Sequence, residues 1–342
     1  MRGGRAWGVG LLAVVAVGCS SAGGSPGTTT LPTALPTSVA ANPTPTTTTT
    51  TSAAAGEFQQ YGFGDPSLEE QQLWFMANRA RADPPAEGRR LANPADQLVA
   101  DGLTAFGVDV DQMVKDFAGY PVRPPLAWNA GLATAASRHA ADQAKARTQS
   151  HAGSDGSKPG ARVRAAGVDY TVLHENISGY AHSAEFAHDA FVIDWGGAAP
   201  TGVQEWPTPG HRFALMSAGA DASSTNAVGM SWVSVAAGDD NYGPYVVVQE
   251  FARVPGLFVV GTVWSDANGD GQFQWGEGVA GVDVRVDGGE WCALTLSGGG
   301  YELPVDAGPA HTVTFRAPDG RTVQQRFDVS ADNVLVDAEL PA

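Results

Sequence analysis

The sequence predicts an α+β protein with two folded parts behind a long polar leader. Apolar residues recur at helical spacing in several segments between residues 66 and 216, whereas residues 227–254 are rich in Val, Trp, Tyr and Phe. Seven further short β-rich runs follow between residues 257 and 340. Helices that precede strands, rather than alternate with them, favour an α+β fold over a parallel βαβ sheet. The 342-residue length fits two domains.

The N-terminus is typical of an export signal. Two arginines precede an apolar run over 6–17, which is too short to span a bilayer permanently. The run ends at Gly18-Cys19, and residues 16–19 resemble a bacterial lipobox, in which Cys19 would be acylated and would anchor the protein to a membrane. Ordinary cleavage nearby and a membrane-retained signal are the alternatives. We therefore expect a location in the bacterial cell envelope or outside the cell.

Residues 20–57 predict a disordered tether. The stretch from Ser20 to Gly56 is mostly Thr, Ser, Pro, Ala and Gly, without an aromatic or charged residue, so it cannot bury enough apolar surface to order itself. The formal charge of −16 argues against a nucleic-acid partner. With Cys19 assigned to the leader, Cys292 is alone, so no disulfide framework is expected. We expect a monomer.

Residues 58–255 predict a first domain of helices followed by a strand hairpin. Pro66 is expected at the first position of a helix that carries Leu68, Leu73 and Met76 on its apolar face and stops at 83–85. The remaining predicted helices span 97–106, 110–117, 130–146, 161–166, 183–194 and a short segment after 210. The predicted strands span 227–235 and 245–254, joined by a Gly- and Asp-containing turn.

Most of the side chains that could do chemistry lie close together in the sequence. Six of the 7 histidines fall between His139 and His211, and imidazoles and carboxylates are the groups that bind borderline metals and move protons near neutral pH. His139 is expected to be a packed helix residue, and His182 and His188 to be solvated surface residues. Ser150 next to His151 does not favour a serine hydrolase, because no Gly-x-Ser-x-Gly motif is present.

Several motifs, in order and spacing, resemble the CAP superfamily in its bacterial form. They are Asn78-Arg79-Ala80, Leu126 to Asn129, Leu132 to Ala140, Ser150-His151 with Gly153 to Gly156, Glu175-Asn176-Ile177, Gly210-His211-Arg212 and the strand Val247 to Phe251. The resemblance implies an α-β-α sandwich with a central cleft over residues 66–254. It also implies that His151, His211 and Glu175 face that cleft and bind Zn²⁺ or a similar divalent metal.

Each of these three residues also has a simpler interpretation. His151 could be an exposed turn residue, His211 could cap a helix, and Glu175 could bind backbone amides. If a metal is bound, two imidazoles and a carboxylate would leave an open position of the catalytic type. Glu175 could instead stay off the metal and act as a base toward bound water.

Two departures from the family pattern affect the site. The usual glycine before the Glu-Asn pair is His174, which could add a ligand or crowd the site. The second family acid usually follows a tryptophan, but Trp195 is followed by Gly196. Asp194, Glu185 and Glu205 are the candidates to replace that acid.

Residues 256–342 predict a β-sandwich that contains a calcium loop. The seven expected strands span 257–264, 281–286, 292–296, 301–305, 312–315, 323–329 and 334–340. Five residues have the spacing of a twelve-residue calcium loop, with glycine at its sixth position: Asp266, Asn268, Asp270, Gln272 and Glu277. The segment resembles the calcium-binding B-type repeats of bacterial adhesins, with a prealbumin-like fold. An acidic turn without an ion is the alternative; bound Ca²⁺ would be structural.

These features support three hypotheses about function. The first is an exported, lipid-anchored CAP-domain protein that binds a metal or a ligand (a lipid, peptide or glycan) in its cleft. The alternative is a metal-dependent hydrolase that acts on peptide or envelope polymer. The third is a structural surface spacer. Because one fold hosts many activities, the fold alone does not choose between them.

Overall fold

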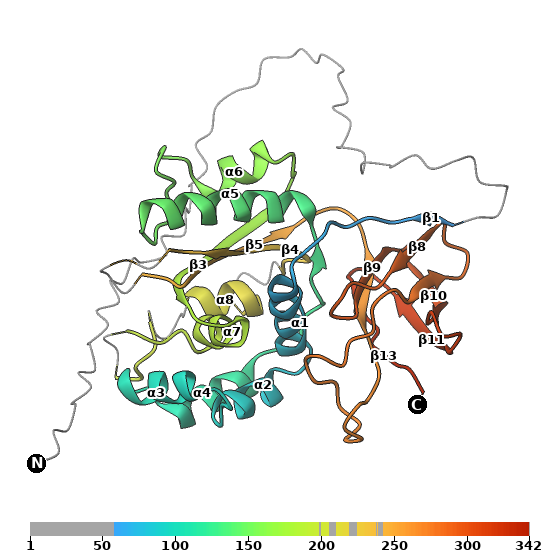
Figure 1. Ribbon diagram of the computed structural model, residues 1–342, viewed down its shortest axis with the longest axis horizontal. Helices are drawn as coiled ribbons and strands as arrows, with labels where there is room; N and C mark the ends of the chain where they lie inside the picture. Colours follow the sequence, from blue (N-terminus) through green and yellow to red (C-terminus); the bar gives the residue numbers. More distant parts are fainter. Residues whose placement is uncertain are drawn as a thin grey trace, which may run out of the picture.

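The computed structural model describes residues 58–197, 200–204, 210–218, 224–236, 238 and 242–341. An N-terminal part made of helices and one sheet lies beside a C-terminal module of strands, residues 256–341 (Figure 1). This arrangement confirms the predicted α+β class. The predicted signal, Cys19 and the tether lie outside the described residues.

The N-terminal part is built around a four-stranded sheet in the order β2-β4-β5-β3. Its strands are β2 (Ala127–Trp128), β3 (Val172–Ala181), β4 (Ala227–Ser234) and β5 (Tyr245–Arg253). The helices are α1 (Leu68–Ala82), α2 (Pro84–Leu91), α3 (Gln97–Ala105), α4 (Val110–Gly119), α5 (Ala130–Ala146), α6 (Pro159–Ala165), α7 (Ala184–Ile193) and α8 (Gly210–Met216). Helices α5 and α6 cover one face of the sheet, and α1, α7 and α8 cover the other (Figure 1).

Helix α1 begins two residues later than predicted. Ser67 is the N-cap, because its hydroxyl accepts a hydrogen bond from the Glu70 amide while the Glu70 carboxylate accepts one from the Ser67 amide. This start leaves Leu68 exposed (48%), so Leu68 does not belong to the apolar face.

Helix α2 was missed from the sequence. Asp83 ends α1, but its carboxylate also accepts a hydrogen bond from the Ala86 amide and so caps a second helix, with Pro84 at its first position. The Asp-Pro-Pro stop signal therefore also starts a helix. Helix α2 contributes Glu87 and Arg90 to a buried polar network described below.

The C-terminal module consists of two sheets around one core. One sheet has the order β1-β8-β7-β10-β11, and the other consists of β12, β6, β13 and β9. Their strands are β1 (Gln59–Gln60), β6 (Phe258–Trp264), β7 (Asp283–Val286), β8 (Trp291–Leu294), β9 (Gly300–Pro304), β10 (Gly308–Arg316), β11 (Thr322–Val329), β12 (Val334–Leu335) and β13 (Ala338–Glu339). Val263, Val284, Tyr301 and Phe315 from both sheets share one hydrophobic cluster.

The module is joined to the N-terminal part by buried polar contacts. The carboxylate of Glu302 on β9 accepts a hydrogen bond from the Trp128 amide of β2 and another from the Tyr61 hydroxyl, 3.4 Å away. The Asn333 amide donates to the carbonyls of Pro125 (3.0 Å) and Asn226 (2.7 Å). The largest hydrophobic cluster of the N-terminal part also includes Val260 of β6. The two parts therefore share a continuous interior.

Strand β1 precedes the N-terminal part in sequence but belongs to the module. Gln59 and Gln60 pair in parallel with Trp291 and Cys292 of β8, after which the chain passes into α1. Within the described part of the chain, none of the helices is long and apolar enough to cross a membrane.

Candidate metal-binding site

His151 and Glu175 form the first of two imidazole–carboxylate pairs. Nδ1 of His151 lies 2.8 Å from Oε1 of Glu175 on β3, and the Glu175 carboxyl group is almost fully buried. Arg162 on α6 donates to Oε2 of Glu175 and also to the His151 carbonyl, at 3.2 Å. Both Glu175 oxygens are therefore engaged, and Arg162 fixes the loop that carries His151.

A second glutamate lies beneath this pair. Glu250 is opposite Glu175 in the β3–β5 ladder, so both side chains are on the same face, and Glu250 is fully buried. Burial and the neighbouring Glu175 charge raise the pKa of Glu250 well above its usual range. Burial opposes ionisation of Glu175 as well, but the hydrogen bond with His151 and the charge of Arg162 lower the pKa of Glu175. These effects favour a negative charge on Glu175 over one on Glu250.

His211 and Asp194 form the second pair. Helix α7 ends at Asp194, a left-handed residue (φ 60°) whose carboxylate is fully buried. Its Oδ1 lies 2.7 Å from Nδ1 of His211, and its Oδ2 accepts hydrogen bonds from the amides of His211 and Arg212. Asp194 therefore orients the ring and satisfies two free amides at the start of α8.

Arg212 locks this second pair in place. It is fully buried, and its guanidinium donates to the carbonyls of Val192 (2.7 Å) and Ile193 (2.6 Å), at the end of α7. Because Arg212 follows His211 in sequence, these bonds hold the start of α8 against the end of α7. The position of His211 is thus fixed by main-chain contacts as well as by Asp194.

Strand β3 connects the two pairs. Glu175 holds His151, and the next residue, Asn176, donates to the His211 carbonyl at 3.1 Å and to Gln249 at 3.1 Å. Successive strand residues point to opposite faces, so Glu175 faces α5 and α6 whereas Asn176 faces α7 and α8. Because β3 is an edge strand, both pairs lie at the same border of the sheet.

Several sequence interpretations can be compared with these positions. Asp194 is the acid that the structure places against His211, whereas Glu185 lies 3.7 Å from Arg90 and Glu205 is outside the described residues. The candidates for the second acid could not be separated in the sequence, because the left-handed turn that aims Asp194 has no motif of its own.

Three other histidines are also placed. His174 is exposed on β3. His139 is buried in α5, and its Nε2 lies 2.9 Å from the Ser150 carbonyl. The prediction for His188 was wrong: its side chain is fully buried rather than solvated, because α7 packs against α1 and the ring bonds to Glu87 of α2.

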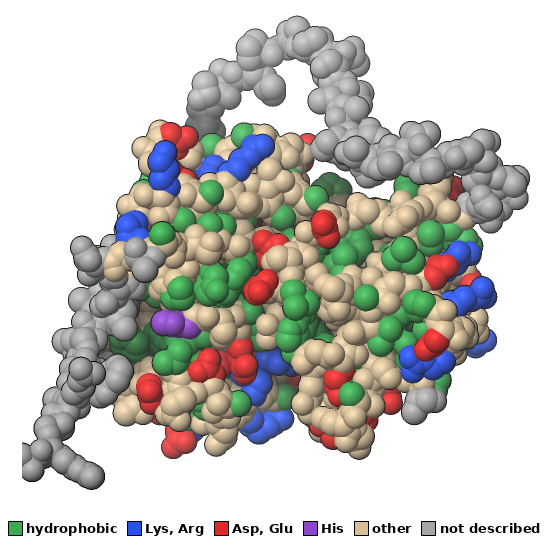
Figure 2. All heavy atoms as spheres, in the orientation of Figure 1, with side chains coloured by type: hydrophobic (Ala, Val, Ile, Leu, Met, Phe, Trp, Pro, Cys, Tyr) green, Lys and Arg blue, Asp and Glu red, His purple; other side chains and the backbone are tan. Residues whose placement is uncertain are grey.

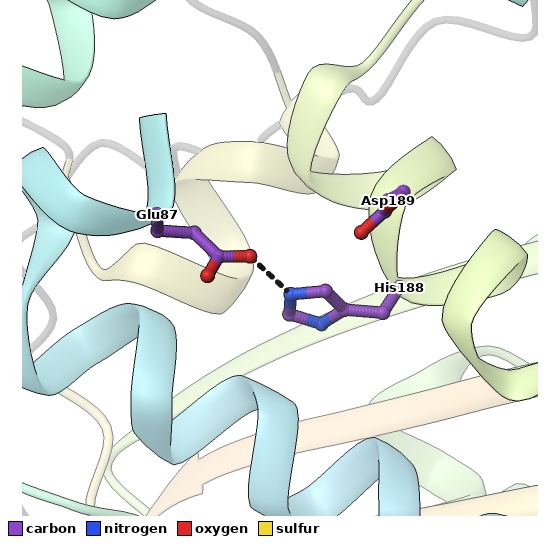
Figure 3. A group of neighbouring side chains, drawn as sticks. All are labelled: Glu87, His188 and Asp189. Carbon is purple, nitrogen blue, oxygen red and sulfur yellow. Dashed lines mark hydrogen bonds and ion pairs between the residues drawn. The ribbon is translucent and has the colours of Figure 1, made fainter. Parts of the chain in front are cut away.

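His188 belongs to a buried network that links α2 to α7. Nε2 of His188 lies 3.0 Å from Oε1 of Glu87, and Figure 3 shows Asp189 beside the two groups. Among the described residues, these three are the one group of His, Cys, Asp or Glu side chains whose ligand atoms all lie within 4.8 Å of one another, and the predicted set of His151, Glu175 and His211 does not come that close. This proximity is what a metal site requires.

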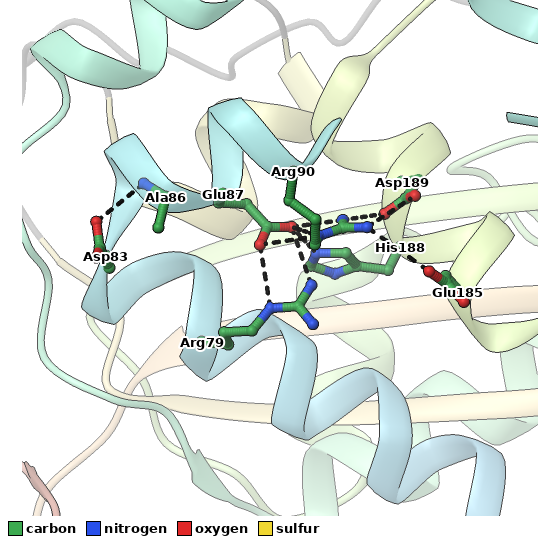
Figure 4. A network of polar contacts seen from close by, with 8 residues as sticks. All are labelled: Arg79, Asp83, Ala86, Glu87, Arg90, Glu185, His188 and Asp189. Carbon is green, nitrogen blue, oxygen red and sulfur yellow. Dashed lines mark hydrogen bonds and ion pairs between the residues drawn. The ribbon is translucent and has the colours of Figure 1, made fainter. Parts of the chain in front are cut away.

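The charges around this group favour an ion-pair network over a metal. Arg90 contacts both Glu87 (2.7 Å) and Asp189, and Arg79 contacts Glu87 at 3.1 Å (Figure 4). Two guanidinium groups already balance the two carboxylates, so a divalent cation there would be repelled by both arginines. We therefore assign this network to stability. Two of its residues, Glu87 and Arg90, lie in the segment 87–123, whose role the sequence does not indicate.

The predicted calcium loop is held by its own backbone. The carboxylate of Asp266 accepts hydrogen bonds from the amides of Gly269 (2.7 Å) and Gly271 (2.8 Å). Glu277 accepts them from Ala267 and Gln274. Bonds from the Gly271 amide, with others from the loop backbone, lower the pKa of Asp266. Asn268, Asp270 and Gln272 are exposed.

Comparison with known proteins locates a family within the chain. Residues 121–251 match the sequence profile of CAP, the "Cysteine-rich secretory protein family". The matched segment includes both imidazole–carboxylate pairs, whereas α1–α4 and the C-terminal module lie outside it. A search of curated proteins found no match.

Two similar solved structures were found. One is an extracellular protein containing an SCP domain from Bacillus anthracis str. Ames, with 18% identity and a TM-score of 0.28; the match covers 45% of this chain and 41% of that one. The other is an outer surface protein from Borrelia burgdorferi, with 17% identity and a TM-score of 0.28, covering 38% of this chain and 78% of that one. This chain thus spans about two fifths of the length of the first.

Proposed function

We propose, from the CAP domain at residues 121–251, that this is an exported protein that binds a divalent metal of the zinc type through His151 and His211. The observation that carries the proposal is the carboxylate on Nδ1 of each ring, at 2.8 Å for Glu175 and 2.7 Å for Asp194. A carboxylate on one ring nitrogen fixes the tautomer and makes the other nitrogen a stronger metal ligand.

In this proposal, Glu175 and Asp194 orient the imidazoles and do not bind the metal. The Glu175 carboxylate already accepts hydrogen bonds from His151 and Arg162. The Asp194 carboxylate accepts them from the His211 ring and from two backbone amides. A bound zinc ion would supply Lewis acidity and an open position for a ligand. The hydrolase alternative also needs a base, and the proposed arrangement uses both carboxylates to hold the rings. We therefore favour metal-dependent ligand binding.

Zinc titration of the purified protein tests this proposal. We expect calorimetry to show one zinc ion per chain, His151→Ala and His211→Ala to abolish tight binding, and Glu175→Gln or Asp194→Asn to weaken it by about 10- to 100-fold. His182→Ala, which changes an exposed histidine, is the matched control. Equal zinc binding by the wild type and both His→Ala variants would refute the proposed site.

The predicted anchor and calcium loop complete the proposal. Acylation of Cys19 would hold the protein at a membrane, with residues 20–57 as the tether. A calcium ion held by Asp266, Asn268, Asp270, Gln272 and Glu277 would stiffen the module and would not take part in chemistry.

Calcium is expected to raise the melting temperature of the wild type. An ion that binds the folded loop stabilises the folded state by mass action, by about 2.7 kcal/mol at a hundredfold excess over the dissociation constant. Scanning calorimetry with CaCl₂ and with EGTA measures the shift. The double variant Asp266→Asn/Asp270→Asn should lose it, whereas Asp319→Asn, an exposed acid elsewhere in the module, should keep it. A shift of the same size in the double variant would contradict calcium binding by this loop.

A further inference from the structure

A cleft separate from the histidine pairs lies where α1 meets the C-terminal module. Its volume is about 310 Å³, within the range of small-ligand sites, which often occur between domains. One wall is α1, and the other consists of β6, the start of β9 and the loop 266–277. Figure 2 shows apolar side chains across the boundary between the two parts, with acidic side chains beside them.

Aromatic rings from both parts meet in this cleft. Phe75 of α1 packs edge-on against Phe273, with ring centroids 4.6 Å apart, and lies 6.4 Å from Trp275. All three rings are half-buried. The rings are fixed before any ligand arrives, because Phe273 also contacts Trp264 of β6 at 6.1 Å. Half-buried rings of this kind offer flat apolar surface without a large loss of conformational entropy.

Polar groups complete the lining and restrict the class of ligand. Asp83 contributes an exposed carboxylate and Gln272 an exposed amide. Asp337 contributes a carboxyl group that accepts from the Thr262 amide and whose pKa burial raises to about 6. Carboxylates disfavour an anion, and a purely aliphatic ligand would leave them desolvated without partners. A cation is disfavoured because the Arg79 guanidinium already lies 5.9 Å from the centroid of the Phe75 ring. The remaining class is a neutral molecule with both an apolar face and many hydroxyl donors.

We propose that this cleft binds a neutral oligosaccharide, with a sugar ring stacked on Trp275 and sugar hydroxyls that donate hydrogen bonds to Asp83 and Asp337. The C–H face of a pyranose matches a flat indole, and its hydroxyl edge matches carboxylates and amides. The cleft shares no residue with the pairs at His151 and His211, so sugar binding and metal binding are independent properties.

Calorimetry and tryptophan fluorescence on the full-length protein test this proposal with two neutral probes, N,N′,N″-triacetylchitotriose and cellotriose. We expect saturable binding of at least one probe, weakened at least tenfold by Trp275→Ala. Asp337→Asn should also weaken it, while keeping an oxygen for the Thr262 amide. The matched control is Trp232→Phe. It changes a half-buried tryptophan of β4 that stacks on Tyr245 of β5, in the sheet of the N-terminal part and away from the cleft.

Two further variants make the result decisive. Gln272→Ala changes an exposed cleft residue and, with EGTA present so that the proposed calcium loop is empty, should weaken binding without altering the melting temperature, so a loss in Trp275→Ala cannot be ascribed to undocking of the module alone. His151→Ala should leave sugar binding intact, which separates this site from the metal proposal. The proposal fails if neither probe binds the wild type at millimolar concentration, or if Trp275→Ala and Gln272→Ala bind as the wild type does.

Discussion

Glu87→Gln is expected to lower the free energy of unfolding by about 3–5 kcal/mol, because it removes one partner of a buried ion pair. The Glu87 side chain is 2% exposed, and its carboxylate contacts the charged groups of Arg79 and Arg90 and the ring of His188. Burial acts to raise its pKa, but the His188 hydrogen bond and the arginine charges lower the pKa of Glu87 well below the usual range. The carboxylate is therefore charged at neutral pH, and its contribution is lost only as the pH falls into the acid range.

Chemical denaturation at pH 7 measures this loss. Asp283→Asn is the control, since it breaks an exposed Asp–Arg pair on β7 and should cost about 1 kcal/mol or less. An equal, small effect of both substitutions would show that the α2–α7 network does not stabilise the fold. Conversely, if Glu87→Gln removed a bound metal from the purified protein, our assignment of this network to stability would be wrong.

A second large effect is expected from pH, through Glu302. Burial raises the pKa of Glu302 to about 8, although the bonds from Trp128 and Tyr61 oppose the rise. The unfolded chain releases this proton near the ordinary glutamate pKa of about 4.3, so between there and pH 8 the folded state binds the extra proton. Stability must then fall as the pH rises, by about 1.4 kcal/mol per pH unit and by up to about 4 kcal/mol between pH 5 and 8.

Glu302→Gln isolates this contribution. The amide resembles the protonated carboxyl group and can still accept from the Trp128 amide, so the variant should match the wild type near pH 5 and exceed its stability at pH 8. Denaturation curves across this range give the slope for each protein. Parallel slopes would show that Glu302 ionises in the folded state as easily as in the unfolded chain.

The sequence predicted the elements whose signals are local. Helix α5 spans the predicted residues 130–146, and β4 and β5 end within one residue of the prediction. These segments contain complete periodic patterns of apolar residues, as do most strands of the module. Helix α2 and strand β3 were not predicted, since α2 is short and polar, and the His-Glu-Asn segment was interpreted as a motif and not as a strand.

The site was predictable in its residue types and not in its pairing. The motifs pointed to His151, Glu175 and His211, but the second acid depended on the left-handed turn at Asp194 and on Arg212, which clamps α8 to α7. Glu250 was missed because nothing in the sequence of β5 indicates that it lies opposite Glu175 of β3. Such cross-strand and interhelical contacts are set by tertiary packing, which a single sequence does not record.

Strand β1 has a mechanical consequence. The chain ahead of Phe58 joins the molecule at β8, where Gln59 and Gln60 pair with Trp291 and Cys292. Tension applied from the N-terminal side is therefore borne first by these few backbone bonds at the edge of the module, and reaches α1 only after they part. Pulling forces at a tethered surface would thus act on the module before they act on the two histidine pairs.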